Sequence, residues 1–521
     1  MRVKIWLVIG LAILLAWPAV SFGQQPKSGG TFRWSVSGDL QAGGLDPAKF
    51  TDYNGWAIGM DIYNGLVQFD EKNGIAPDLA ERWTVSANSR VYAFFLRKGV
   101  KFTNGRELTA QDFKYSIERI MDPANKSPNT WIFEDVIQGA TAMMKGDAKE
   151  ITGIRVRGPY EVQITLEQPL GHFLALLTMP QAFVLAKEEV ERWGADYVSH
   201  PVGTGPFILE EWRRQDRIIL KANPTYFAGK PYLERQEIRV IPESSTAEAE
   251  FKTGRLDVLG IPDATFRQWV SDPQWKPHII TGAGLNIQYL AFNLRRRPFN
   301  DIRVRRAFAY AIPRKQILES IFNGRGVIAH GPIPPSLPGY NAKIAALPYD
   351  PAKAKALLRE AGYPEGLEVE LLLTPTTNNR RLFDVLEASL RGVGITLRPG
   401  FRERAVYFRE RGAGTFAIAR ADWIADYLDA ENFLYPLFHS ASKHFSGYTS
   451  QKVDQLIDAA RATVDPAQRI RRYQEAEAAI IADMPWVFMW HSVGSTVYQP
   501  WVMGETYDAT PRRTVKIWLN R

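Results

Sequence analysis

Short extended segments alternate with amphipathic helices along most of the chain. Residues 31–36 alternate apolar and polar side chains, as a half-buried strand does. Residues 154–156 and 162–166 are predicted to form a strand pair around a turn, and Phe113, Ile117 and Ile120 are spaced for one face of a helix. Such alternation of strands and helices predicts an α/β protein with mixed sheets covered by helices.

The second half of the chain repeats this pattern after a break. Residues 201–207, rich in Gly and Pro, predict a crossing between subdomains. Strands are expected at 287–293 and 367–373, and long amphipathic helices at 452–462 and 466–482. Residues 486–490 are then expected to form a buried strand that returns toward residues 496–498.

Aromatic rings and several carboxylates are concentrated between residues 422 and 433. The apolar run 416–419 just before them predicts the end of a strand, followed by Trp423, Asp426 and Tyr427. A carboxylate beside an indole at a strand end can neutralise an ammonium group while the ring covers apolar surface. This pattern indicates a ligand cleft, although such rings are often core residues and such an Asp is often a helix cap.

The length of 521 residues, 45% of them apolar, is sufficient for two to four domains. The first 23 residues, with a basic start, an apolar run and small residues near Gly23, predict a cleaved export signal. Its removal takes Lys+Arg from 64 to 62 against 56 acids, so the net charge falls from +8 to +6. The chain has no cysteine, which excludes disulfides, Cys-ligated metals and a lipid-anchoring Cys. We therefore expect a periplasmic protein.

Arginine clusters at 295–297 and at 303–306 raise the question of nucleic acid binding. They flank Pro298-Phe299-Asn300-Asp301, which predicts a turn and a helix start. A solvated helix face explains them better, and no nucleic acid partner is expected.

Motifs of the common enzyme classes do not occur in the chain. The seven histidines include no His-Glu-x-x-His arrangement, and no Gly-x-Ser-x-Gly elbow is present. His439 and His444 are better explained as surface histidines than as a metal pair. The glycine-containing segments 324–329 and 412–417 precede no predicted helix, which argues against a dinucleotide loop. We expect neither a metal, a cofactor nor catalytic residues.

Several short motifs follow one another in an order that is characteristic of one family. They are Leu45-Asp46-Pro47, Ile62-Tyr63-Asn64-Gly65-Leu66-Val67, Leu79-Ala80-Glu81-Arg82-Trp83, Phe95-Leu96-Arg97-Lys98-Gly99-Val100-Lys101-Phe102, Gly105 with Leu108-Thr109-Ala110-Gln111-Asp112, Gly203-Thr204-Gly205-Pro206-Phe207, Pro298-Phe299-Asn300-Asp301 with Arg303-Val304-Arg305-Arg306-Ala307, Tyr349-Asp350-Pro351, and Trp423 with Asp426-Tyr427. With these motifs in this order, the chain resembles the large periplasmic solute-binding proteins of peptide, nickel and oligosaccharide ABC transporters, and the dipeptide and oligopeptide binders in particular.

This resemblance implies a two-lobed periplasmic-binding-protein fold, α/β in class, with an extra α/β subdomain in the first lobe. Lobe I would be assembled from three separate parts of the chain and lobe II from one block. The implied boundaries are 1–23 for the signal, 24–66 and 200–279 for lobe I, 67–199 for the extra subdomain, 280–488 for lobe II, and 489–521 for the C-terminal return to lobe I.

The resemblance also implies which residues contact the ligand. Asp426 would pair with the α-ammonium group of a peptide, with Trp423 and Tyr427 beside it. Arg380 or Arg381, in the segment Asn378-Asn379-Arg380-Arg381, would hold the ligand carboxylate. The loop Thr51, Asp52 and Tyr53 corresponds to a segment that touches ligand in relatives.

These features imply the substrate-binding component of an ABC importer, a monomer that captures a short peptide and delivers it to a membrane permease. The same fold could instead bind an oligosaccharide, a nickel chelate, an opine or haem. A secreted hydrolase or metal-dependent enzyme is the alternative from a different functional class.

Overall fold

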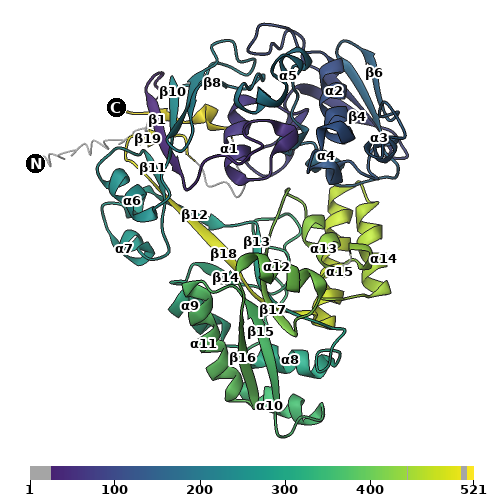
Figure 1. The fold of residues 1–521 in the computed structure, drawn as a ribbon, viewed down its shortest axis with the longest axis vertical. Coiled ribbons are helices and arrows are strands. Elements are labelled where there is room, and N and C mark those ends of the chain that lie inside the picture. Colours follow the sequence, from purple (N-terminus) through teal and green to yellow (C-terminus); the bar gives the residue numbers. More distant parts are fainter. Residues whose placement is uncertain (1–24, 443, 506–512) are drawn as a thin grey trace, which may run out of the picture.

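The computed structural model describes residues 25–442, 444–505 and 513–521, which form two lobes joined by long strands (Figure 1). The expected export signal at residues 1–23 lies outside the described residues. Among the described residues, no helix combines the length and the apolar character needed to cross a bilayer.

Lobe I is built on a four-stranded sheet in the order β1-β10-β9-β8. The first strand runs parallel to β10 although about 200 residues separate them in sequence, so the sheet closes only when distant segments meet. Its elements are β1 (Thr31–Val36), α1 (Tyr53–Ile62), β8 (Phe207–Arg213), β9 (Arg217–Ala222), β10 (Arg235–Val240), α6 (Ser244–Lys252), β11 (Val258–Gly260), α7 (Phe266–Ser271), β19 (Val502–Met503) and β20 (Trp518–Leu519).

An extra subdomain is inserted between α1 and β8. It contains a four-stranded antiparallel sheet, β4-β5-β7-β6, against which α2 packs with its apolar face, including Phe113 and Ile117. Its elements are β2 (Val67–Phe69), β3 (Ile75–Pro77), β4 (Ala80–Val85), β5 (Val91–Leu96), α2 (Ala110–Met121), α3 (Ala140–Met144), β6 (Ile154–Gly158), β7 (Glu161–Thr165), α4 (Phe173–Leu176) and α5 (Lys187–Trp193).

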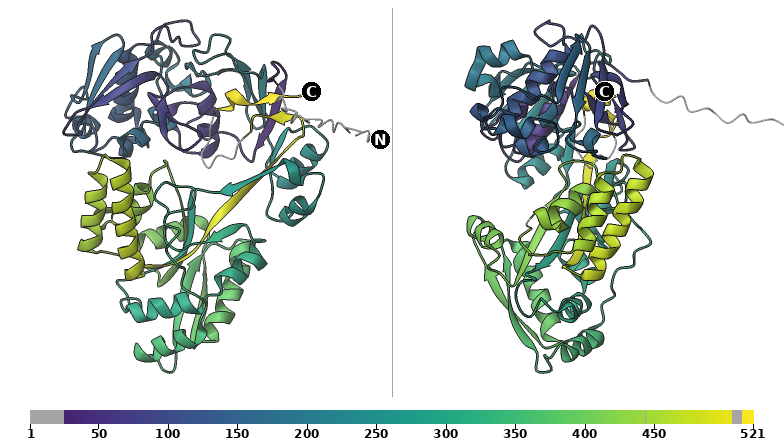
Figure 2. Two further views of the ribbon diagram at one scale, coloured as in Figure 1. Left: turned by 180° about the vertical axis from the view of Figure 1, so that it is seen from behind. Right: turned by 90° about the vertical axis from the view of Figure 1, so that its right-hand side faces the viewer.

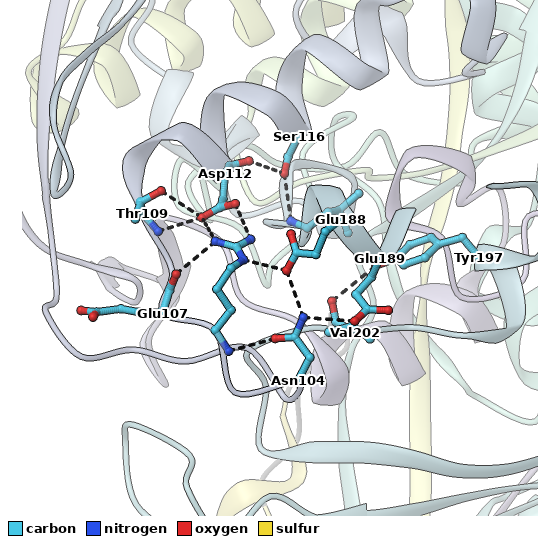
Figure 3. Close-up of polar contacts among 11 residues, drawn as sticks. Asn104, Glu107, Thr109, Asp112, Ser116, Glu188, Glu189, Tyr197 and Val202 are labelled. Carbon is cyan, nitrogen blue, oxygen red and sulfur yellow. Dashed lines mark hydrogen bonds and ion pairs between the residues drawn. The ribbon is translucent and has the colours of Figure 1, made fainter. Parts of the chain in front are cut away.

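Polar contacts at the start of α2 connect that helix to α5 (Figure 3). Thr109 and Asp112 form a capping box, and Arg106 donates to both carboxylate oxygens of Asp112 at 2.6 and 3.0 Å. Arg106 also contacts Glu188 of α5 at 2.6 Å. These contacts stabilise the start of α2, and they satisfy this group of polar side chains without a ligand.

Lobe II is organised around a sheet in the order β13-β17-β15-β16, with β15 parallel to both β17 and β16. Helices cover its two faces (Figure 1, Figure 2). Its elements are β13 (Asn286–Phe292), α8 (Ile302–Ala311), α9 (Arg314–Ile321), β14 (Gly326–Ile328), α10 (Pro351–Glu360), β15 (Leu367–Leu373), α11 (Thr377–Arg391), β16 (Ile395–Phe401), α12 (Arg404–Ala413), β17 (Ile418–Ile424), α13 (Glu431–Phe438), α14 (Gln451–Arg461) and α15 (Pro466–Asp483).

The two lobes are joined by one long strand, β18 (Trp486–Tyr498), and by the neighbouring β12 (Ile279–Ala283). The first half of β18 pairs with β13 in lobe II, and the second half pairs with β12 and β11 toward lobe I. The sequence indicated two pieces here, at 486–490 and 496–498, but the structure forms a single strand. Gly282 and Gly494 lie opposite each other where it passes between the lobes. We call this ladder the hinge.

Short 3-10 segments connect several of these elements. They are Pro47–Lys49, Pro123–Asn125, Thr130–Ile132, Pro180–Ala182, Gly194–Ser199, Lys276–His278, Ser440–Ser442 and Thr514–Lys516.

Candidate ligand-binding cleft

A cavity of about 1020 Å³ lies between the lobes and is lined by residues from both. Lobe II contributes Ile424 to Tyr427, and β12 and β18 of the hinge form one wall. The lobe I wall is rich in aromatic rings: Phe32, Trp34, Tyr53, Trp56, Phe69, Phe183, Tyr226 and Tyr498. Apolar rings with a few polar groups among them are typical of small-molecule sites.

The predicted end of the strand before this segment was wrong. Strand β17 does not end near Ala419 but runs to Ile424, so Trp423 is part of it. Neighbouring side chains on a strand point to opposite faces. Trp423 therefore packs against the core of lobe II, and Ile424, not Trp423, lines the cavity.

Asn432 at the start of α13 holds the segment that follows the strand. Its Oδ1 accepts hydrogen bonds from the backbone N–H of Asp426 at 2.9 Å and from Nε1 of Trp423 at 3.3 Å. Its Nδ2 donates to Oδ2 of Asp426 at 3.4 Å. The indole thus orients Asn432, and Asn432 orients Asp426, although the indole itself does not reach the cavity.

Asp426 is a half-buried carboxylate with no cationic partner among the described residues. Burial raises its pKa above the ordinary value, and the hydrogen bond from Asn432 opposes this only in part. A buried carboxylate without a counter-ion is costly, and a ligand ammonium group would relieve that cost.

Tyr427, the next residue, is buried and connects the cavity to the extra subdomain. Its ring stacks on that of His172, with centroids 5.7 Å apart, and its hydroxyl donates to Glu431. Nε2 of His172 lies 3.6 Å from the Glu431 carboxylate, which also pairs with Arg461 at 3.0 Å.

The backbone of the same region also crosses between the lobes. The N–H of Gly171, in the extra subdomain, donates to the carbonyl of Arg461 in lobe II at 2.7 Å. We call Gly171, His172, Tyr427, Glu431 and Arg461 the far-side junction. The neighbouring elements α4, α13 and α14 lie on the opposite side of the molecule from β12 and β18 (Figure 1, Figure 2). The motifs in the sequence offered no signal for it.

Buried charges fix the C-terminal segment against the lobe I wall. Asp61 accepts hydrogen bonds from Gln236 at 2.7 Å and from the backbone and hydroxyl of Thr514, both at 2.9 Å. Burial raises the pKa of Asp61 to about 6. Arg513 pairs with buried Asp78 at 2.8 Å. The wall therefore includes residues 513–517, which sequence reasoning assigned to lobe I but not to the site.

The predicted loop residues 51–53 have separate roles. Tyr53 lines the cavity, whereas the side chain of Asp52 caps α1 by accepting from the N–H of Gly55 at 3.0 Å. Thr51 is exposed and does not line the cavity. Asp directly before a helix commonly caps it, which explains the position of the Asp52 side chain.

Arg380 and Arg381 are exposed on the first turns of α11 and do not line the cavity. The Arg380 guanidinium lies over the ring of Phe401, 4.7 Å from its centroid. Because β15 and β17 are parallel, however, the start of α11 and the segment around Asp426 follow the same edge of the sheet.

The charge of the lining favours a cationic group on the ligand. Five carboxylates line the cavity (Asp61, Asp70, Glu71, Asp426 and Glu505) against three cations (Lys72, Arg513 and Lys516), and two of these cations already pair with carboxylates. In the part of the chain that the structure describes, no group of three His, Cys, Asp or Glu side chains is placed to hold a metal ion.

Two lobes enclosing an aromatic, acidic cavity at a strand hinge define a solute-binding clamp. A family model for bacterial extracellular solute-binding proteins, family 5 (middle), matches residues 74–445. The chain belongs to this family, whose members are the substrate-binding components of ABC importers and work with membrane permeases. The two-lobed α/β fold expected from the sequence is thereby confirmed.

Individual relatives cover nearly the whole chain. It is 31% identical over 487 residues to heme-binding protein A of Haemophilus influenzae, covering 88% of this chain and 87% of that protein. It is 30% identical over 482 residues to the dipeptide-binding protein of Escherichia coli, covering 88% of each.

Solved structures agree with this assignment. The periplasmic binding protein DppA of Helicobacter pylori, in complex with the peptide STSA, matches with a TM-score of 0.76 at 30% identity, covering 95% of this chain and 99% of that one. HbpA2 of Haemophilus parasuis matches with a TM-score of 0.84 at 27% identity, covering 94% and 100%.

Proposed function

We propose that this protein captures a short peptide or peptide-like amine between its lobes and delivers it, chemically unchanged, to an inner-membrane permease. The observation that carries the proposal is Asp426, a half-buried carboxylate in the cleft without a cationic partner among the described residues. The similarity to a dipeptide-binding protein and to a peptide complex supports it. The predicted export signal supports a location in the periplasm, and we propose that the protein acts there as a monomer.

The ammonium group of the ligand occupies the space beside Asp426 in this proposal. Enclosure removes water from the charge, so the charge needs a fixed partner of opposite sign. Asn432 holds the backbone of Asp426 in place before the ligand arrives, which limits the ordering cost of binding.

Arg380 or Arg381 receives the ligand carboxylate once the lobes close. Both side chains are exposed at the start of α11, and neither pairs with a carboxylate among the described residues. They follow the same sheet edge as Asp426, so a zwitterion lying along that edge would meet a charge of opposite sign at each end.

The test compares a free peptide with its N-acetylated form. Native mass spectrometry first identifies any solute that copurifies, and calorimetry then measures Ala-Ala-Ala and N-acetyl-Ala-Ala-Ala. We expect acetylation to weaken binding at least about tenfold, which corresponds to about 1.4 kcal/mol for one charge-assisted contact. Asp426→Asn should cause a similar loss.

A matched control is available on β17, the strand just before Asp426. Asp422 is exposed, pairs with Arg420 at 2.9 Å and does not line the cavity, so Asp422→Asn should leave affinity unchanged. Equal binding of acetylated and free peptide would show that the ligand is not held by its amine. Turnover of a bound peptide would contradict the role in transport.

The affinity should also depend on pH with a defined sign. Binding an ammonium group requires the ionised form of Asp426, whose pKa is raised by burial. Affinity is therefore full above that raised pKa and falls as the pH drops through it. Calorimetry of Ala-Ala-Ala from pH 7 to pH 4, a range in which the peptide amine is mostly protonated, should show this fall in the wild type and a weaker one in Asp426→Asn.

A further inference from the structure

Two large apolar side chains are unusually exposed, and both line the cleft. Ile424 is 66% exposed and Tyr53 is 62% exposed, more than any other large apolar side chain among the described residues. Ile424 ends β17 in lobe II, whereas Tyr53 begins α1 in lobe I. The most water-exposed apolar surfaces of the described chain therefore lie on the two lobes of one cavity.

Ile424 has a fixed relation to the carboxylate of the site. The strand pairing continues one residue beyond it, because the N–H of Ala425 donates to the carbonyl of Leu285 at 2.8 Å. The chain then bends at Asp426. Ile424 and Asp426 both line the cavity, so an apolar side chain lies two residues before the anion.

We propose that Ile424 and Tyr53 determine specificity, closing on an apolar side chain that lies beside the ligand's ammonium group. The substrate class is then a peptide or amine with a Leu-like or Phe-like side chain at its first or second position. This inference rests on the proposed function and narrows it. Burying such a side chain between the two lobes removes the exposed surfaces of Ile424 and Tyr53 from water. A ligand with a large apolar side chain therefore favours closure more than a ligand with a small side chain does.

The surrounding wall supports an apolar occupant. Trp34, Trp56 and Phe69 line the lobe I side of the same cavity, and the indole N–H of Trp34 is already satisfied by Gln236 at 3.1 Å. The indole N–H of Trp56 has no hydrogen-bond partner among the described residues, but it is fully buried, so neither indole presents an accessible donor. These rings therefore offer surface for an aliphatic or aromatic side chain.

The experiment measures three peptides by calorimetry: Ala-Ala-Ala, Leu-Ala-Ala and Ala-Leu-Ala. We expect at least one of the leucine peptides to bind about tenfold more tightly than Ala-Ala-Ala. Ile424→Ser and Tyr53→Ser should each reduce this preference to below about threefold. Both side chains are exposed, so these variants should fold, which circular dichroism verifies. The loss caused by N-acetylation should persist in both variants, because Asp426 is untouched.

Tyr349→Ser is the matched control, since Tyr349 is 53% exposed but lies outside the cavity; it should keep the full preference. Equal affinities for all three peptides, or a preference that survives both cleft variants, would overturn the specificity proposal while leaving the proposed function intact. No binding of any of the three peptides would overturn the proposed function, and this proposal with it.

Discussion

The lobes meet on two sides of the cavity, and the two contacts are made differently. At the hinge, backbone hydrogen bonds of β12, β13 and β18 carry the connection, with Gly282 opposite Gly494. At the far-side junction, rings and charged side chains meet, and among the described residues the backbone contact there is a single hydrogen bond from Gly171 to Arg461. At the hinge the chain itself runs from one lobe to the other. The far-side junction, in contrast, can separate without breaking a strand.

This difference indicates which contact responds to ligand. A strand ladder bends at glycines while its hydrogen bonds persist, which suits a hinge. The far-side junction includes Tyr427, which also lines the cavity next to Asp426. A ligand held beside Asp426 would therefore lie next to a residue of the separable contact. The comparison predicts that changes at the junction alter the distance between lobes, and that changes in the hinge hydrogen bonds alter mainly stability.

The largest effect is expected for Gly171→Ala. A Cβ at this position would lie 2.3 Å from the backbone carbonyl oxygen of Thr463 in lobe II. The carbonyl cannot rotate away as a side chain can, so the junction has to separate, at a cost of about 1–3 kcal/mol. Because the chain has no cysteine, spin labels can be placed through Lys149→Cys and Lys452→Cys, exposed on the two sides of the junction. The distance between the labels should lengthen.

Gly158→Ala provides the control for this substitution. Gly158 lies in the same subdomain, and a Cβ there would meet nothing within 4 Å. The label distance should stay at the wild-type value. An unchanged distance in Gly171→Ala would mean that the junction does not hold the lobes together.

The second effect is a pH response of the junction through His172. Burial lowers the pKa of His172 to about 3, so the imidazole is neutral in the junction, near Glu431, Asp429, Arg461 and Arg469. After separation the pKa would return to about 6.5, so the separated form binds a proton as the pH falls below that value. The separated fraction should therefore rise on the order of tenfold between pH 7.5 and pH 5.

His172→Gln isolates this response. The pKa of Glu431 is raised by burial, so its titration opposes that of His172, but it is present in both proteins. The difference between wild type and variant, measured with the same spin labels, reports His172 alone. Identical pH curves would show that His172 stays buried when the lobes move.

The contrast between the hinge and the far-side junction also explains which features could be predicted from the sequence. Local signals were reliable where one segment decides the outcome: Asp301 caps α8, where the sequence predicted a helix start, and Asp426 lies in the cleft. Trp423 was misplaced because the strand was predicted to end too early, and alternation along a strand decides which neighbour faces the cavity.

Other features depend on residues that only the fold brings together. His172 and Glu431 are about 260 positions apart, and Thr514 reaches Asp61 across more than 450. Their pairing leaves no periodicity or spacing in the chain, so it could not be predicted from a single sequence. The hinge was predicted only in part, because both ends of β18 are apolar. The continuity of β18 through Ser492 to Ser495 depends on pairing with β14 and β12.

The smallest effect is expected in the hinge itself. Oγ1 of Thr281 lies 3.0 Å from Oγ of Ser495, a hydroxyl pair between β12 and β18. Thr281→Val keeps the shape of the side chain and removes this hydrogen bond, so it should lower the free energy of unfolding by about 0.5–1.5 kcal/mol, measured by urea denaturation. The backbone ladder remains intact, so the label distance across the far-side junction should not change. A lengthening as large as that of Gly171→Ala would mean that the hinge side chains, and not the junction, set the separation of the lobes.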